Sequence, residues 1–264
     1  MVKLALVVMG ATVLGAFGAA VALSVRGAAG ALVELAAATS STLAWGAGIL
    51  VAVPASLHAF RDDRRSGVRA LLVARGASAA VYARGRVIGL AIVLFAVVGG
   101  GTLVSGGAAV LLASRAGVAA HALEGLVAAL VYAAAFAIVV APMALAALGA
   151  RSTGRGYARF IVLLVVPELL KPWTSDLVPA GWGELLSVPS ALAGLRGALL
   201  PQAFDVARGA RAGFVLAAFA ALCFAFVLAE IAGIDAEADG ESPAPNFQGP
   251  PQGAVRSAPD ESRA

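Results

Sequence analysis

Five long stretches without a charged side chain most constrain what this chain can fold into. They cover residues 4–25, 35–60, 87–114, 125–150 and 212–229, and they are 22, 26, 28, 26 and 18 residues long. A helix needs about 20 mostly apolar residues to cross the hydrocarbon core of a bilayer, and about 17 is the lower limit. Each stretch is therefore long enough to cross a membrane once, and none is long enough to cross twice.

The composition excludes a soluble globular protein. Hydrophobic residues make up 61% of the 264 residues and charged residues only 13%, whereas soluble proteins average about 45–50% and about 25%. So few polar residues cannot cover the surface of a soluble domain of this length. We therefore expect an all-α integral membrane protein.

A sixth, less apolar stretch over residues 157–173 is about 25 Å long as a helix, which is just enough for a thin crossing. We accordingly predict six transmembrane helices within residues 1–234. The first stretch exceeds the apolar region of about 7–15 residues found in signal peptides, so we expect it to be retained. Residues 235–264 are rich in acidic residues, Pro, Gly and Ser, a composition that predicts a disordered cytoplasmic tail.

The distribution of basic residues predicts the topology. With the N-terminus inside, eleven of the Lys and Arg residues near the spans fall on the inner side and six on the outer side. This bias places both termini in the cytoplasm. Because the basic residues lie in short loops between apolar stretches, the net charge of +4 does not indicate a nucleic-acid partner.

Residues that could carry out catalysis are scarce. His58 and His121 are the only histidines, and the predicted topology puts them on opposite sides of the membrane, where they cannot share a metal ion. A Gly-Lys-Ser/Thr phosphate loop is absent, because Lys3 and Lys171 are the only lysines and are followed by Leu and Pro. We predict no catalytic residue, metal or cofactor. Any ATP hydrolysis would be done by a separate polypeptide.

The predicted inner loop over residues 60–86 has a regular pattern. Val68, Leu71 and Leu72 recur at helical spacing, and Arg75-Gly76 is typical of a helix end. The sequence therefore predicts a short cytoplasmic helix over residues 67–74. From charge alone this loop is a topology signal that lies on lipid headgroups.

The same loop resembles the coupling segment of ABC-2-type membrane subunits of ABC transporters, which has an acidic residue, Gly-Thr, Leu-Leu, a Pro, and Gly-Lys opening the third span. Here Asp62 or Asp63 matches the acid, and Gly85-Arg86 matches Gly-Lys; Val68 stands in place of Thr and Gly76 in place of Pro. No amphipathic helix precedes the first span, which leaves a haem-exporter-like subunit open. The residues that would contact an ATPase are Asp62, Asp63, Arg64, Arg65, Gly67, Val68, Arg69, Leu71 and Leu72.

The resemblance implies a six-span permease subunit in the inner membrane of a bacterium. It implies export as the function. The partners it implies are a second permease subunit, identical or different, a separate ATPase dimer in the cytoplasm, and the surrounding lipid bilayer. The alternative is a membrane protein outside the ABC class, either a scaffold subunit or a secondary carrier. A carrier would normally show inverted repeats and ionisable residues in mid-span, and neither is evident in the sequence.

The segment over residues 172–211 is too interrupted by Pro and Gly to span, yet it is rich in Leu and Trp. It predicts one or two short helices at or dipping into the outer face, a feature that is similar to the re-entrant helices of the ABC-2 family. Just before it, Glu168 and Lys171 stand three residues apart on one helix face. We interpret them as a structural ion pair, with a role in a substrate pathway as the alternative.

Overall fold

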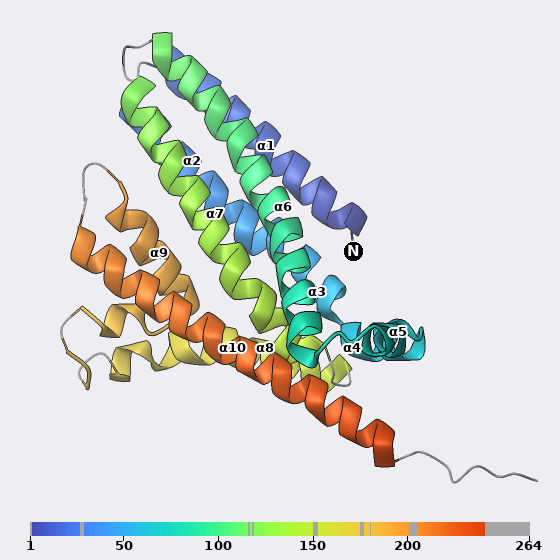
Figure 1. The fold of residues 1–264 in the computed structure, drawn as a ribbon. Coiled ribbons are helices and arrows are strands. Elements are labelled where there is room, and N and C mark those ends of the chain that lie inside the picture. The colour runs from blue at the N-terminus through green and yellow to red at the C-terminus, as the bar shows by residue number, and fades with distance from the viewer. Residues whose placement is uncertain are drawn as a thin grey trace, which may run out of the picture.

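The computed structural model describes residues 2–26, 29–115, 117, 119–149, 153–174, 177–179, 181–200 and 205–240. Within these ranges the chain is built from helices (Figure 1). The long helices are α1 (Val2–Val25), α2 (Ala29–Leu43), α6 (Ala79–Arg115), α7 (Ala119–Leu148), α8 (Thr153–Thr174) and α10 (Val206–Gly240). The short ones are η1 (Ala44–Gly48), α3 (Ile49–Ser56), α4 (Ala59–Arg65), α5 (Val68–Ala74), η2 (Gly183–Leu185) and α9 (Val188–Ala198).

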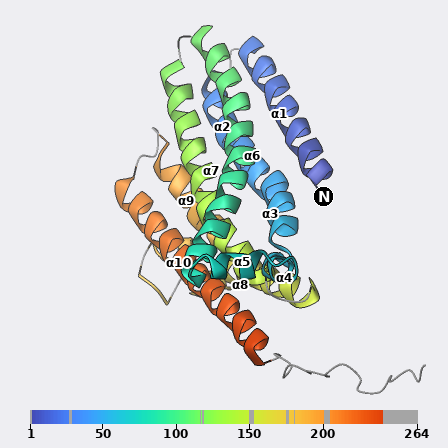
Figure 2. The ribbon, with the colours of Figure 1, turned by 45° about the vertical axis from the view of Figure 1, so that its right-hand side comes forward.

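Among the described residues, five helical segments are long and apolar enough to cross a membrane. They are Lys3–Val25, Glu34–Arg65, Ala79–Arg115, Ala119–Leu148 and Val206–Ala236. The fifth of the six predicted spans, now part of α8, is not among them. Its charged residues and two internal prolines, Pro167 and Pro172, lower its hydropathy, and α8 lies across the lower end of the bundle in both views (Figures 1 and 2).

Helix α7 forms the centre of the bundle. It packs against α2, α3, α6, α8, α9 and α10, and every residue from 139 to 149 is buried. This part of α7 is rich in Ala, whose small side chain lets neighbouring helices approach closely in a membrane. A helix that is apolar on all sides is expected in such a central position.

Close packing also accompanies the change of helix type between α2 and α3. There the chain forms the π-helical turn η1, and a Cβ atom on Gly48 would lie 2.8 Å from the ring of Phe136 in α7. Trp45 meets the same ring edge-on at 5.4 Å between centroids. Glycine at position 48 is therefore what lets this turn contact α7.

Two predicted boundaries can be compared with the structure. Helix α10 continues past the boundary predicted between residues 234 and 235 and ends at Gly240. The Asp-Ala-Glu-Ala run at 235–238 favours helix, and the Asp235 side chain is held by α5. Residues 241–264 of the predicted tail lie outside the described residues. Between α8 and α10, where short helices were predicted, the chain forms η2 and α9.

Candidate functional site

The α3–α4 corner, where the predicted inner loop begins, rests on the end of α7. His58 adopts a left-handed conformation with φ 59°, which turns the chain between the two helices. Its backbone N–H donates to the Leu148 carbonyl at 3.1 Å, and the Phe60 N–H donates to the Gly149 carbonyl at 3.1 Å. Carbonyls at a helix C-terminus have no partner within the helix, so this corner supplies the partners that the end of α7 needs.

Asp63 joins α4 to α6. Its side chain is buried and accepts hydrogen bonds from the Tyr82 hydroxyl and from Nε of Arg86, the latter at 2.7 Å. Nη2 of Arg86 donates to the second carboxylate oxygen. A bidentate guanidinium–carboxylate pair fixes orientation as well as distance. Asp63 therefore holds α4 rigidly against the first two turns of α6.

Arg69 joins α5 to α10. Arg69 is only 9% exposed, and its Nη2 donates to Oδ2 of Asp235 at 2.7 Å. The guanidinium carbon also lies 5.0 Å from the centre of the Tyr82 ring. Beside it, Nη1 of Arg64 donates to the Ile234 carbonyl at 3.1 Å. The end of α10 is thus bound to both α4 and α5.

The family resemblance assigned nine residues to a contact with an ATPase, and the structure divides them into buried and exposed members. Asp63 and Arg69 are buried in internal ion pairs, and Arg64 and Leu72 are half-buried. A direct contact of Asp63 or Arg69 with a partner would require breaking those ion pairs, so we exclude both from the docking face. The exposed members are Asp62, Arg65, Gly67, Val68 and Leu71.

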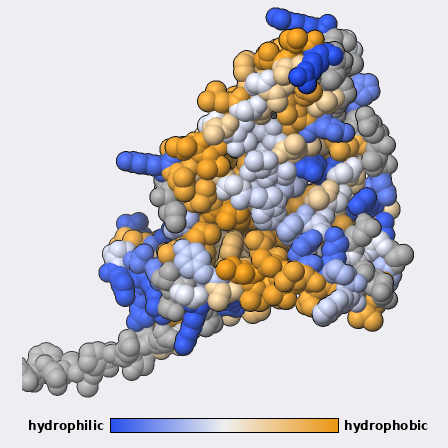
Figure 3. Space-filling view, turned by 180° about the vertical axis from the view of Figure 1, so that it is seen from behind, coloured by the Kyte–Doolittle hydropathy of each residue, from blue (hydrophilic) through white to orange (hydrophobic). Residues whose placement is uncertain are grey.

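The exposed face of α4 and α5 combines apolar and basic side chains. Leu71 is 54% exposed and Val68 is 42% exposed, and Arg65 lies three residues before Val68. Gly67 (φ 75°) and Gly76 (φ 79°) adopt left-handed conformations on either side of α5, which glycine tolerates without strain. Figure 3 shows hydrophilic residues gathered at this end of the bundle and apolar residues over much of the flank.

Glu168 and Lys171 join α8 to the start of α9. Nζ of Lys171 lies 3.9 Å from Oε1 of Glu168 and 2.9 Å from Oγ of Ser190. Glu168 accepts hydrogen bonds from the hydroxyls of Ser187 and Ser190. Ser187 is the N-cap of α9 and accepts from the Ser190 N–H at 3.2 Å. The two charged groups therefore fix the beginning of α9 on α8.

Two further basic residues make contacts that the sequence analysis did not anticipate. Nη1 of Arg159 lies 2.5 Å from Oε1 of Glu230, which links α8 to α10. Arg196 of α9 donates to the Ala37 carbonyl of α2 at 2.8 Å and lies over the Tyr132 ring of α7 at 5.3 Å. Glu230 directly follows the charge-free stretch 212–229. An acidic residue at the end of an apolar stretch was the sequence feature that could have indicated an ion pair there.

Together these features define a class of protein. It is helical, with several apolar helices of membrane-crossing length, and its α4–α5 segment is held to neighbouring helices by ion pairs at one end. No three His, Cys, Asp or Glu side chains in the described part of the chain are grouped so that they could hold a metal ion. Comparison with known proteins assigns no family, since no family model, no curated protein and no solved structure matches the chain.

Proposed function

We propose that this chain is the membrane subunit of an ABC-2-type transporter, coupled to a separate cytoplasmic ATPase through α4 and α5 and acting in export. The observation that carries the proposal is that one short segment is bonded to three membrane-crossing helices. The α3–α4 corner binds α7, Asp63 binds α6, and Arg64 and Arg69 bind α10.

Such a segment suits the transfer of force. A conformational change driven by ATP binding must reach the membrane helices through a rigid contact, because a flexible loop would absorb the displacement. Packed elements with a few discrete arrangements can convert a small shift at one site into a larger rearrangement. In this account a displacement of α4 and α5 acts on α6, α7 and α10 at the same time.

The exposed face has the chemistry of a docking surface. Val68 and Leu71 offer an apolar centre and Arg65 and Asp62 a charged rim, which is the usual arrangement of protein–protein interfaces. The internal ion pairs of Asp63 and Arg69 leave those residues to position the segment. In the proposed assembly, two membrane subunits lie in a bacterial inner membrane and bind an ATPase dimer in the cytoplasm. Both termini of each membrane subunit are cytoplasmic.

The alternative is a scaffold subunit of a membrane complex. Its supporting observation is the network of ion pairs itself, because Arg159–Glu230 and Arg86–Asp63 would equally stiffen a static framework. The two proposals differ in the partner they require, since only the transporter needs an ATPase.

Purification from native membranes in mild detergent tests the proposal. We expect a cytoplasmic protein with a phosphate-binding loop to co-purify in stoichiometric amount and to be lost in the Arg65→Glu/Leu71→Glu double variant. Arg155→Glu is the matched control, because Arg155 is also exposed but lies on α8. Reversal of Arg69 is unsuitable as a test, because it would break the internal pair with Asp235.

Two results would contradict the transporter proposal. One is the absence of any ATPase under conditions that keep other transporters of the same membrane intact, which would favour the scaffold. The other is an ATPase that the double variant retains as well as the wild type does, which would place the contact elsewhere on the protein.

A further inference from the structure

We propose that a groove between α1, α3 and α6 binds one anionic phospholipid of the surrounding bilayer. The groove consists of two adjoining cavities. The first, with a volume of about 380 Å³, is lined by Ala5, Leu6, Met9, Val51, Pro54, Ala55, Val93 and Val97. The second, of about 260 Å³, is lined by Ala55, Gly85, Arg86, Gly89, Leu90, Val93 and Leu145. Ala55 and Val93 line both, so the two cavities adjoin.

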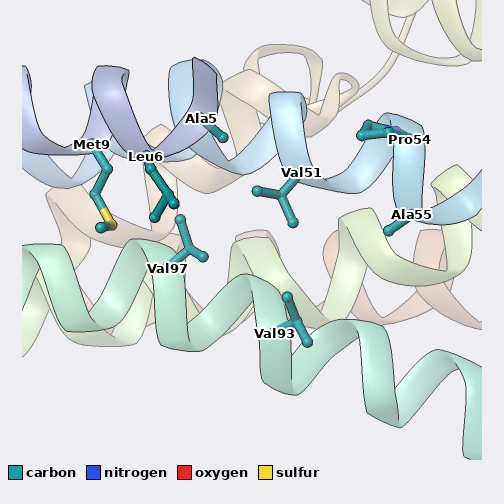
Figure 4. A pocket seen from close by; sticks show the side chains of 8 residues that line it. All are labelled: Ala5, Leu6, Met9, Val51, Pro54, Ala55, Val93 and Val97. Carbon is teal, nitrogen blue, oxygen red and sulfur yellow. The ribbon is translucent and has the colours of Figure 1, made fainter. Parts of the chain in front are cut away.

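The upper part of the groove fits an acyl chain. Its side chains come from three helices and face a common space, with Leu6 and Met9 of α1 opposite Val97 of α6 (Figure 4). All of these side chains are apolar, and the cavity is open to the outside of the bundle. Apolar concave sites of about 300–1,000 Å³ are typical of small-ligand binding, and at this position the available apolar ligand is lipid.

The lower part of the groove contains a guanidinium, which Asp63 pairs with from one side. Arg86 lines it and is 40% exposed. Its Nε and Nη2 donate to Asp63, and these contacts use two of the five N–H donors of a guanidinium. Lys3 lies three residues before Leu6, which places it on the same face of α1 as that lining residue.

Glycine keeps the space beside Arg86 open. Gly85 and Gly89 line the second cavity, and a Cβ atom at either position would meet no atom within 4 Å. A headgroup can therefore reach the guanidinium without moving α6. Basic pockets between membrane helices are a recognised mode of anionic lipid binding, and charge complementarity favours an anionic headgroup over a zwitterionic one.

The site is independent of the proposed transport function, although Arg86 connects it to α4 through Asp63. Native mass spectrometry of the full-length protein tests it directly. The protein is equilibrated in detergent with equal amounts of phosphatidylglycerol and phosphatidylcholine of the same chain length. We expect one phosphatidylglycerol per chain to be retained, in preference to phosphatidylcholine by about tenfold, which corresponds to about 1.4 kcal/mol.

Two pairs of variants locate the lipid. Ala55→Trp fills the junction of the cavities, and Ile88→Trp is its control, because Ile88 is 56% exposed on α6 and lines neither cavity. Gly89→Leu fills the lower cavity, and Gly107→Leu is its control, because it also has open space around it on α6. We expect Ala55→Trp and Gly89→Leu to lose the retained lipid and the controls to keep it.

Three outcomes would overturn the proposal. Equal retention of both lipids would show that the headgroup is not recognised. Unchanged retention in Ala55→Trp and Gly89→Leu would show that the lipid binds elsewhere. A dimer that carries no lipid would show that a second copy of the chain covers the groove.

Discussion

The lower end of the bundle and the flank formed by α1 are held together in different ways. At the lower end, α4 and α5 are bound to their neighbours by buried charged groups, among them Asp63 and Arg69. Helix α1 instead packs through small apolar residues, with Ala5, Ala16 and Ala20 buried, while Leu14 and Phe17 are exposed. Directional polar bonds fix the orientation of helices, whereas small apolar residues hold helices together by close van der Waals packing.

This difference bears on how such a protein would work. A joint that transmits movement needs fixed geometry, which the lower end provides. Helix α1 borders the proposed lipid groove, together with α3 and α6. A helix in that position does not need a fixed orientation relative to its neighbours. The following predictions test whether the two regions really differ in this way, and they run from the largest expected effect to the smallest.

Asp63→Asn should destabilise the protein most. The substitution leaves Arg86 without its carboxylate, and breaking a buried ion pair costs about 3–5 kcal/mol. We expect the lower end of that range, since the Arg86 side chain is 40% exposed. Thermal unfolding in detergent measures the effect. Asp62→Asn is the control, since Asp62 is exposed on the same helix. Equal unfolding temperatures for the two variants would contradict the assignment of Asp63 as a structural link.

Gly149→Val should loosen the contact between the α3–α4 corner and α7. A Cβ atom at position 149 would overlap the ring of Phe60, and overpacking of this kind costs about 1–3 kcal/mol. Gly154→Val, which would meet no atom within 4 Å, is the control. Limited proteolysis of the 56–78 region should be faster in Gly149→Val alone. Identical cleavage rates would show that the corner does not depend on α7.

The Arg69–Asp235 pair should contribute a smaller amount. The Asp235 side chain is 41% exposed, and solvent-accessible pairs are worth about 0.2–1 kcal/mol. A double-mutant cycle with Arg69→Met and Asp235→Asn should therefore give a coupling energy near 1 kcal/mol. A coupling energy of zero would mean that the end of α10 is held by the Arg64–Ile234 hydrogen bond and apolar contacts instead.

Leu14→Ala on α1 should have the smallest effect. Leu14 is 73% exposed, and substitutions at such positions usually change stability by less than about 0.5 kcal/mol. Thermal unfolding under the same conditions as for Asp63→Asn gives the comparison. A loss of stability as large as that of Asp63→Asn would remove the distinction between the two regions.

Some of this structure could be predicted from the sequence. The charge-free stretches correspond to the five helical segments of membrane-crossing length, because the length and polarity of a helix decide whether it can cross a bilayer. The Arg75-Gly76 pair marks the end of α5, where Gly76 has a φ of 79°. These are local features, and local chemistry was enough to predict them.

The pairing of charged residues could not be predicted in the same way. Asp63 binds residues 19 and 23 positions further on, and Arg69 binds Asp235, 166 positions away. Such partners are set by how helices meet in space. For this reason the sequence predicted a single docking surface over the 60–86 loop. In the structure, the side chains of Asp63 and Arg69 are buried. The span predicted within α8 is not confirmed, because its charged residues and prolines keep its hydropathy below that of the other five segments.

Site-specific photocrosslinking from position 71 in intact membranes tests the central claim most directly. A photoreactive residue replaces Leu71 on α5, and the same residue at Leu111 on α6 is the control, because both side chains are exposed. The proposed coupling role predicts a crosslink from position 71 to a cytoplasmic ATPase, changed in yield by ATP, and none from position 111. Crosslinks from position 71 to lipid alone would contradict it and leave the loop as a topology signal.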